Sequence, residues 1–256
     1  MKIFYFTATG NSLAVAKQFQ GELISIPQVI GSDTLVYADD AIGIIFPLYC
    51  LNPPKMVREF LKKTTFKTNY LFAIATYGNL AGASMQELQK FAKIYGYQFD
   101  YMNKLLMVDN FLPNFDIREE ISKLPGKKTE KCLAQIVSDV NNRKRSIPKA
   151  TIKDKALSAM CAPLMKQQDK GKTAENFMVN HNCVHCGICA KVCPAANICV
   201  SEQITFGGMC VGCYACIHAC PQNAIHLKNE KSDARWINPD VDLAELISSN
   251  NRSNRK

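Results

Sequence analysis

Short apolar runs alternate with longer runs of mixed polarity over residues 1–142 of the chain. The longer runs carry apolar residues every three or four positions, which is typical of a helix that packs one face against a core. The run AIGIIFP is apolar throughout, as expected for a strand buried on both faces of a parallel sheet. We therefore predict strands at 2–6, 22–27, 41–47, 70–76 and 99–108, and helices at 12–20, 54–63, 82–96 and 127–142.

This alternation of strands and helices predicts a parallel sheet with right-handed crossovers and helices on both faces. The fold class expected for residues 1–146 is therefore α/β, with a doubly wound parallel sheet. The pattern blurs over residues 147–180, where Lys, Pro and Gly are common. We expect a connector there, with one helix near 156–166.

The last third of the chain follows a different pattern. Residues 182–227 hold only two charged residues, Lys191 and Glu202, and the segment is too small for a hydrophobic core of its own. We expect residues 181–228 to form a small domain that needs cross-links. Residues 229–256 are expected to be a tail that packs back on a domain surface through Trp236, Val241, Leu243 and Leu246.

The net charge of +9 is concentrated in one segment. Residues 117–172 carry 14 basic and 6 acidic residues and account for eight of the nine excess positive charges. Such a segment is typical of a solvated helix face and linker, and it also suits a docking patch for an acidic redox partner. Nucleic acid is not favoured as a partner, because the segment has no interleaved aromatic residues and no known binding motif.

No apolar run approaches the roughly 20 residues that a membrane-spanning helix needs. The sequence starts MKIFYF, without the basic, apolar and small-residue regions of a secretory signal. We therefore expect a cytoplasmic protein with no membrane span.

Nine of the 12 cysteines lie between Cys183 and Cys220, in a chain with no export signal. Two runs there, one starting at Cys183 and one at Cys210, share the spacing C-x2-C-x2-C-x3-C-P. Cytosolic thiols stay reduced, so this density indicates metal ligands rather than disulfides. Structural zinc sites usually pair one C-x2-C with a distant second pair, which fits these two runs poorly. We therefore predict iron–sulfur clusters.

The cysteine spacing resembles that of bacterial two-cluster ferredoxins, in which the fourth cysteine of each run binds the other cluster. The segments PAANI and PQNAI continue the repeat after each run, as in a duplicated half-domain. The resemblance implies two [4Fe–4S] clusters with separate ligand sets. The first cysteine set is Cys183, Cys186, Cys189 and Cys220, and the second cysteine set is Cys193, Cys210, Cys213 and Cys216.

The segment TATGNS, residues 7–12, lies between the first predicted strand and the first predicted helix. At such a turn, backbone N–H groups and the helix dipole point toward an anion. Ser, Thr and Asn are also ordinary helix caps. The segment is neither a Walker loop nor a G-x-G-x-x-G fingerprint, so neither ATP nor a dinucleotide is favoured.

With this loop, residues 1–146 resemble a flavodoxin, whose phosphate loop reads S/T-x-T-G-x-S/T. The resemblance implies that FMN binds outside the carboxyl ends of the strands, where the strand order reverses. Tyr49 and Tyr77 are then candidates to stack on the isoalloxazine ring, and the alternative is a tyrosine at a loop edge. The implied FMN-binding residues are Thr7, Thr9, Gly10, Asn11 and Ser12 in the first loop, Pro47, Leu48 and Tyr49 in the second, and Thr76, Tyr77, Gly78 and Asn79 in the third.

The whole arrangement resembles the EFR1 family of flavodoxin–ferredoxin fusion proteins, which implies electron transfer in anaerobic metabolism. We expect a protein that relays electrons between two [4Fe–4S] clusters and FMN and exchanges them with redox partner proteins. The alternative is a flavin-dependent reductase of a specific small molecule, with the clusters as an internal wire and with Tyr49, Cys50 and residues 109–115 near the substrate. A redox-sensing regulator that binds nucleic acid is not favoured. An electron carrier is favoured over an enzyme, and we assign no catalytic residue.

Overall fold

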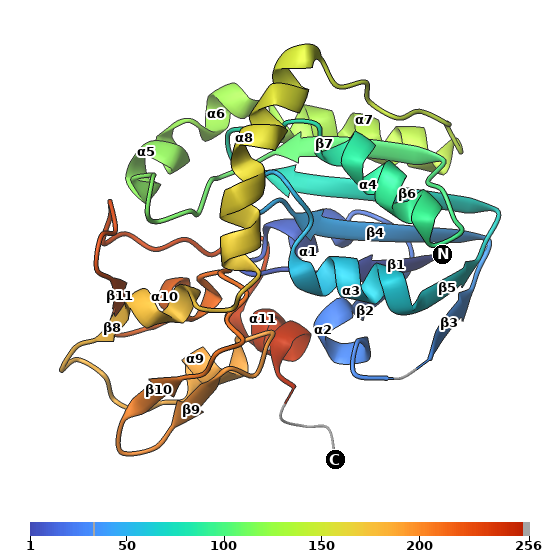
Figure 1. The fold of residues 1–256 in the computed structure, drawn as a ribbon. Helices are drawn as coiled ribbons and strands as arrows, with labels where there is room; N and C mark the ends of the chain where they lie inside the picture. The colour runs from blue at the N-terminus through green and yellow to red at the C-terminus, as the bar shows by residue number, and fades with distance from the viewer. Residues whose placement is uncertain (33, 253–256) are drawn as a thin grey trace.

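Five parallel strands form the central sheet of the N-terminal part, in the order β2–β1–β4–β6–β7 (Figure 1). Counted among themselves, they have the order 2-1-3-4-5, which is the flavodoxin-like order of a doubly wound sheet. The computed structural model describes residues 1–32 and 34–252. The strands are β1 (Lys2–Tyr5), β2 (Glu22–Ser25), β4 (Ala41–Pro47), β6 (Tyr70–Tyr77) and β7 (Tyr101–Leu106). The predicted α/β fold class is confirmed.

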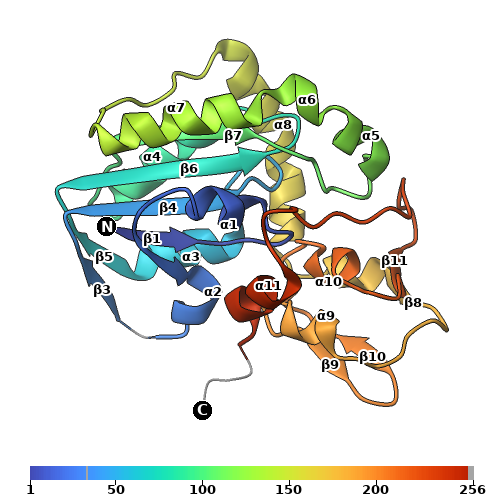
Figure 2. The same ribbon diagram turned by 180° about the vertical axis from the view of Figure 1, so that it is seen from behind.

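Helices cover both faces of this sheet, because neighbouring side chains in each strand point to opposite sides. In β1, Ile3 joins the core on one side and Phe4 joins the core on the other. Figure 2 shows α1 and α7 in front of the sheet, and Figure 1 shows α3 and α4 on the opposite face. The covering helices are α1 (Asn11–Ala16), α3 (Lys55–Lys63), α4 (Ser84–Ile94) and α7 (Thr129–Asn141).

Several short elements of this part were not predicted. The strands β3 (Leu35–Ala38) and β5 (Thr64–Lys67) form a separate parallel pair. Each has four residues, too few for a pattern of alternating polarity to stand out from a loop. The helices α2 (Ile26–Val29), α5 (Ile117–Ser122) and α6 (Leu124–Lys127) are similarly short.

The cysteine-rich part repeats its backbone as well as its sequence, and residues 177–227 are called the duplicated unit below. The order strand, helix, strand occurs in each half, and each antiparallel ladder joins one strand from each half. The first half is β8 (Phe177–Val179), α9 (Ile188–Lys191) and β9 (Ile198–Val200), and the second is β10 (Ile204–Phe206), α10 (Ala215–His218) and β11 (Ile225–Leu227). The repeat begins at Phe177, before the expected boundary at 181, because β8 is needed to pair with β11.

A long helix and a tail connect the two parts. Helix α8 (Ile152–Gln168) is longer than the predicted 156–166, because Thr151 and Asp154 form a capping box at its start. A 3-10 turn, η1 (Thr173–Asn176), then leads into the duplicated unit. In the tail, α11 (Leu243–Asn250) lies between α2 and α9 (Figure 2). Val241 and Leu246 are buried in the same core as Ile3, so the predicted return of the tail is confirmed.

Within the described residues, no helix is both long and apolar enough to cross a membrane.

Candidate redox site

A cavity of about 240 Å³, called the central cavity below, lies where the carboxyl ends of β1, β4 and β6 face the duplicated unit. Every residue predicted to bind FMN lines it except Gly10. The structure therefore brings together three loops that are far apart in the sequence. Those lining residues are Thr7, Thr9, Asn11, Ser12, Pro47, Leu48, Tyr49, Thr76, Tyr77, Gly78 and Asn79.

The opposite walls of the central cavity come from three further segments, of which only residues 109–115 were expected here from the sequence. The loop after β7 contributes Asp109 and Phe111, and helix α8 contributes Leu164 and Gln168. The duplicated unit contributes Cys213, a member of the second cysteine set. One cavity is thus lined both by the predicted flavin loops and by a predicted cluster ligand.

The first loop is held in place by side chains from other segments. Asn110 Nδ2 donates to Thr9 Oγ1 at 2.7 Å, and Trp236 Nε1 donates to Asn11 Oδ1 at 3.2 Å. The hydroxyls of Ser12 and Thr76 lie 2.9 Å apart, which ties the first loop to the third. These contacts hold the loop in place before any ligand binds.

Gly10 faces away from the central cavity and toward the tail. Its φ is +96°, a conformation that L-residues with a side chain adopt at a cost. A Cβ on Gly10 would lie 3.0 Å from Asn238 Cβ and 3.1 Å from Val241 Cβ. The glycine therefore lets the loop turn and lets the tail approach its outer side.

The second loop places Tyr49 next to two residues of unusual backbone conformation. Cys50 and Leu51 have φ values of 45° and 63°, and they close a turn in which Tyr49 and Asn52 exchange backbone hydrogen bonds. The Cys50 thiol donates to Gln168 Oε1 at 3.4 Å. Burial raises the pKa of this thiol, so it stays protonated and packed.

The third loop is locked against the end of β7. Asn79 Nδ2 donates to Asp109 Oδ2 at 3.0 Å, and any side chain on Gly78 would overlap Asp109. Lys127 Nζ donates to the carbonyl of Gly78 at 3.0 Å and forms a buried ion pair with Glu120 at 3.0 Å. Burial raises the pKa of Asp109, the first residue of the segment that the sequence placed near a substrate.

Each cysteine set lines its own small cavity in the duplicated unit. The first cysteine set surrounds one cavity and the second cysteine set surrounds another, so each run sends its fourth cysteine to the other group. The supporting loops repeat their backbone in step with the two cysteine runs. Positive φ values recur in the pairs His185 and Gly212, Gly187 and Tyr214, and Ala196 and Asn223.

The cysteine sulfurs receive backbone hydrogen bonds in the same repeat. Asn197 N donates to Cys193 Sγ at 3.4 Å, and Ala224 N donates to Cys220 Sγ at 3.2 Å. Such donors stabilise thiolates and the sulfurs of bound clusters. Burial raises the pKa of Cys189 to about 11, so a metal would have to displace its proton.

The cysteine arrangement fits a cluster better than a single ion. Among the described residues, no three His, Cys, Asp or Glu side chains converge closely enough to hold one metal ion. A zinc ion would require four ligands within about 2.3 Å of one point. Four cysteines around one cavity are the ligand number that a [4Fe–4S] cubane takes, and each cysteine set provides it.

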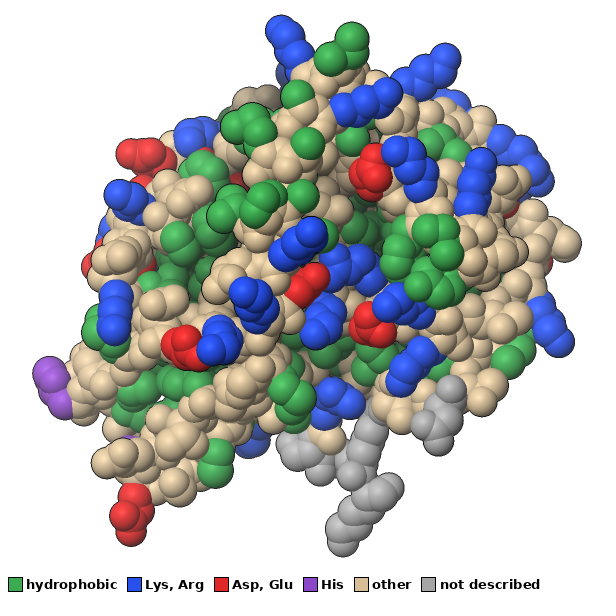
Figure 3. Space-filling view, viewed as in Figure 1, with side chains coloured by type: hydrophobic (Ala, Val, Ile, Leu, Met, Phe, Trp, Pro, Cys, Tyr) green, Lys and Arg blue, Asp and Glu red, His purple; other side chains and the backbone are tan. Residues whose placement is uncertain are grey.

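The two cysteine sets differ in their exposure. Cys186 of the first set is exposed and the neighbouring Val184 is 61% exposed, whereas Cys213 and Cys216 of the second set are buried. Figure 3 shows Lys and Arg side chains spread over the upper and right parts of this face and sparse over the duplicated unit at lower left. The first set therefore lies near a weakly charged surface, and the second set lies beside the central cavity.

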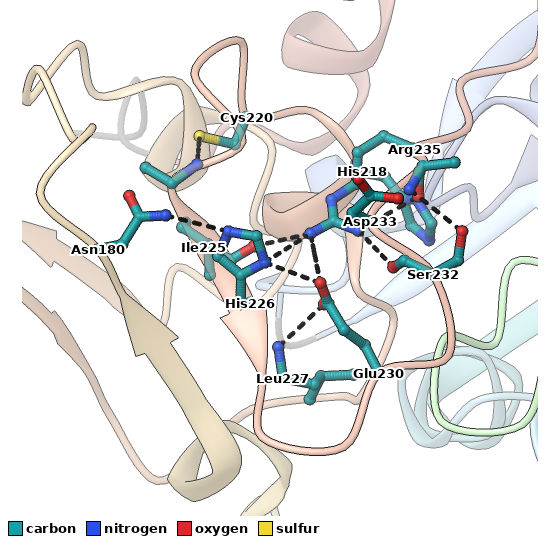
Figure 4. Close-up of polar contacts among 12 residues, drawn as sticks. Asn180, His218, Cys220, Ile225, His226, Leu227, Glu230, Ser232, Asp233 and Arg235 are labelled. Atoms are coloured by element: carbon teal, nitrogen blue, oxygen red, sulfur yellow. Dashed lines mark hydrogen bonds and ion pairs between the residues drawn. The ribbon is translucent and has the colours of Figure 1, made fainter. Parts of the chain in front are cut away.

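A polar network closes the end of the duplicated unit next to Cys220 (Figure 4). Glu230 accepts hydrogen bonds from His226 Nδ1 at 2.7 Å and from Arg235 at 3.0 Å. His226 Nε2 accepts one from Asn180 Nδ2 at 3.2 Å, which joins the two halves of the repeat. Burial opposes the ionisation of Glu230, but these hydrogen bonds outweigh it and lower the pKa of the carboxyl.

Comparison with known proteins supports the assignment of the cysteine-rich part. Residues 208–226 match the family model of the 4Fe-4S binding domain, which supports at least one 4Fe-4S cluster. Over 67 residues the chain is 37% identical to the B subunit of the ion-translocating oxidoreductase complex of Methanosarcina acetivorans. The aligned region covers 25% of this chain, and it spans only a quarter of the length of that curated relative.

Among solved structures, a protein from Bacteroides uniformis that is assigned as a flavoprotein is 17% identical, with a TM-score of 0.32. The similarity covers 41% of this chain and 88% of that chain. The chain thus combines a sheet of flavodoxin-like strand order with a 4Fe-4S binding domain.

Proposed function

We propose that this chain is an electron-transfer protein that relays electrons between two [4Fe–4S] clusters and FMN. The observation that carries the proposal is the central cavity, whose wall includes both the three predicted flavin loops and Cys213. A flavin accepts one or two electrons, whereas an iron–sulfur cluster exchanges one at a time, so a chain with both can collect electrons singly and deliver a pair.

In this proposal the two cysteine sets have different tasks. The first cysteine set, with Cys186 exposed, holds the cluster that meets a redox partner. The second cysteine set, with Cys213 and Cys216 buried, holds the cluster beside the flavin. Electrons therefore pass between the surface and the central cavity through the interior of the duplicated unit.

The chain's own residues fit FMN at the central cavity in two respects. The first loop is held rigidly by Asn110 and Trp236, so its backbone N–H groups need little reordering to meet a phosphate. Tyr49 and Tyr77 both line the cavity and remain our candidates to contact the isoalloxazine ring.

The walls of the central cavity favour a carrier over a reductase. Helix α8 covers one side with Leu164 and Gln168. A flavin would leave little space for a separate substrate, so we propose no small-molecule reduction.

We propose that the physiological partners are redox proteins, as in the EFR1 family that the sequence resembles. Part of the basic charge of residues 117–172 is neutralised within the chain, because Arg118 pairs with Asp233 and Arg145 pairs with Asp100. A partner's acidic patch therefore meets less free charge than the sequence indicates. The anaerobic setting and the cytoplasmic location remain predictions from the sequence.

The order of electron entry tests the proposal. Anaerobic stopped-flow mixing with a low-potential one-electron donor should bleach the cluster absorbance before the flavin absorbance. The double variant Cys186→Ser, Cys213→Ser should keep FMN and lose this fast entry.

NADH or NADPH alone should reduce the protein slowly or not at all, because the sequence has no dinucleotide fingerprint. Rapid reduction of the flavin by NADPH in the cluster-free double variant would overturn the relay and indicate a nicotinamide-dependent flavin reductase.

A further inference from the structure

The hydroxyl of Tyr49 is buried from solvent and, among the described residues, has no hydrogen-bond partner. Buried side-chain hydroxyls in native proteins are nearly always paired, so an orphan needs an explanation. Bulk water is not the missing hydrogen-bond partner, because the hydroxyl oxygen is out of contact with solvent. A ligand bound next to the hydroxyl would supply that partner.

The ring of Tyr49 is fixed, so the hydroxyl has little freedom to seek another partner. It packs edge to face with the ring of Phe6, with ring centroids 6.3 Å apart. The turn of Cys50 and Leu51 holds its backbone, with Tyr49 and Asn52 joined by hydrogen bonds of 2.8 and 2.9 Å. Tyr49 also packs against the apolar core that contains Cys213.

Two cavities place Tyr49 beside the second cysteine set. Tyr49 lines the central cavity together with Cys213, and it lines a second cavity together with Cys210. Both cysteines and Tyr214 also act electrostatically on the hydroxyl. None of these side chains is within hydrogen-bond reach of the Tyr49 oxygen. We therefore place the missing acceptor on the side of the hydroxyl that Cys213 and Cys210 border.

We propose that Tyr49 donates a hydrogen bond to a sulfur of the cluster held by the second cysteine set, and that this bond raises the reduction potential of that cluster. The inference rests on the proposed function, since it requires that the cluster is present. A hydrogen bond to a cluster sulfur stabilises the reduced, more negative form. Tyr49 thus makes the inner cluster a better electron acceptor than the same cluster without this bond.

The variant Tyr49→Phe removes only the oxygen and keeps the ring that lines the central cavity. In an anaerobic potentiometric titration followed by EPR, the reduced-to-oxidised ratio of one cluster should fall about tenfold at a fixed potential. For a one-electron couple this ratio corresponds to a shift of about 59 mV to lower potential. The other cluster should keep its potential.

The matched control is Tyr77→Phe, which removes a hydroxyl from the same cavity on the third loop. The thiol that acts electrostatically on Tyr77 is that of Cys132, which lies outside both cysteine sets. This control should shift neither cluster potential. Equal shifts in the two variants, or no shift in Tyr49→Phe at full iron content, would overturn the inference.

Cluster-free protein provides a second test that does not depend on redox readings. There the Tyr49 hydroxyl has no acceptor, so Tyr49→Phe should keep or raise the thermal midpoint, whereas it should lower the midpoint of the loaded protein. Destabilisation of both forms would mean a purely structural role and would overturn the inference. Loss of iron from a variant whose cluster-free form is stable would support it.

Iron and flavin contents of the wild type are measured first. A chain without the second cluster refutes the proposed function itself, and a loaded chain with no Tyr49 effect refutes only this inference.

Discussion

His218 donates a hydrogen bond from Nε2 to the backbone carbonyl oxygen of Asn110, at 2.9 Å. Burial lowers the pKa of His218 to about 4, so the imidazole is neutral at neutral pH, and its Nδ1 accepts from the Trp236 N–H at 3.1 Å. Asn110 in turn holds Thr9 of the first loop. The helix that carries Cys216 is therefore joined to the predicted phosphate loop through the side chains of His218 and Asn110.

We expect His218→Leu to weaken FMN binding about tenfold, which corresponds to about 1.4 kcal/mol. The substitution leaves the Asn110 carbonyl and the Trp236 N–H without their partner, and a lost buried hydrogen bond costs about 1–3 kcal/mol. Flavin fluorescence titration gives the affinity. The control His185→Asn changes an exposed histidine at positive φ, which Asn tolerates, and should leave the affinity unchanged. Unaltered FMN affinity in His218→Leu at normal iron content would refute this link.

Anaerobically purified protein should contain about eight irons per chain if both cysteine sets hold [4Fe–4S] clusters. Cys220→Ser should remove the cluster of the first set and leave about four irons. Cys199→Ser is the control, because Cys199 is exposed and lies outside both sets. Iron analysis with EPR of the reduced protein checks both variants. Stoichiometric zinc without iron in the wild type would contradict the assignment.

FMN should bind about 100-fold more tightly than riboflavin, which lacks the phosphate. Two charge-assisted hydrogen bonds from the first loop would account for about 3 kcal/mol, or roughly this factor. Competitive titration of the flavin-free protein compares the two ligands. Equal affinities for FMN and riboflavin would mean that residues 7–12 do not bind the phosphate.

Gly10→Ala should destabilise the protein by about 2 kcal/mol, since the change both strains a positive φ and pushes the new Cβ against Asn238 and Val241. Gly96→Ala separates the two causes. Gly96 also has a positive φ, 84°, but a Cβ there would have nothing within 4 Å of it. Chemical denaturation should therefore find a smaller loss of unfolding free energy, about 1 kcal/mol, for the Gly96 variant. Equal losses in the two variants would show that the tail does not contact the new side chain at position 10.

Glu230→Gln should lower the thermal midpoint at pH 7 by about 2–4 °C, which corresponds to roughly 1 kcal/mol after allowance for solvent screening. The pKa of Glu230 in the folded state is below its unfolded value of about 4.3. The ionised carboxylate therefore contributes to the free energy of unfolding above that pH, and this contribution is lost as the pH falls. The difference between wild type and variant should therefore narrow below about pH 4. Scanning calorimetry from pH 7 to pH 3 measures this difference in thermal midpoint. A difference that does not change with pH would exclude the Glu230 carboxylate as its cause.

Much of the local structure follows from the sequence because it depends on near neighbours. The apolar run AIGIIFP predicts the buried strand β4, and the repeated cysteine spacing predicts turns that recur in both halves of the duplicated unit. The loops after β1, β4 and β6 could be expected to meet, because parallel strands end at the same edge of a sheet. Four-residue elements such as β3 and β5 escaped prediction, since their pairing with each other is a distant contact.

The tertiary structure alone decided what surrounds the predicted loops. The approach of Cys213 to Tyr49, of α8 to the central cavity and of Asn238 to Gly10 joins residues that are far apart in the chain. No periodicity or spacing encodes such contacts, because they result from how whole elements pack once their apolar faces are buried. The sequence by itself predicted the two kinds of site, through turns and spacings within each segment. Packing between the segments determined that the residues predicted for the two sites share one wall.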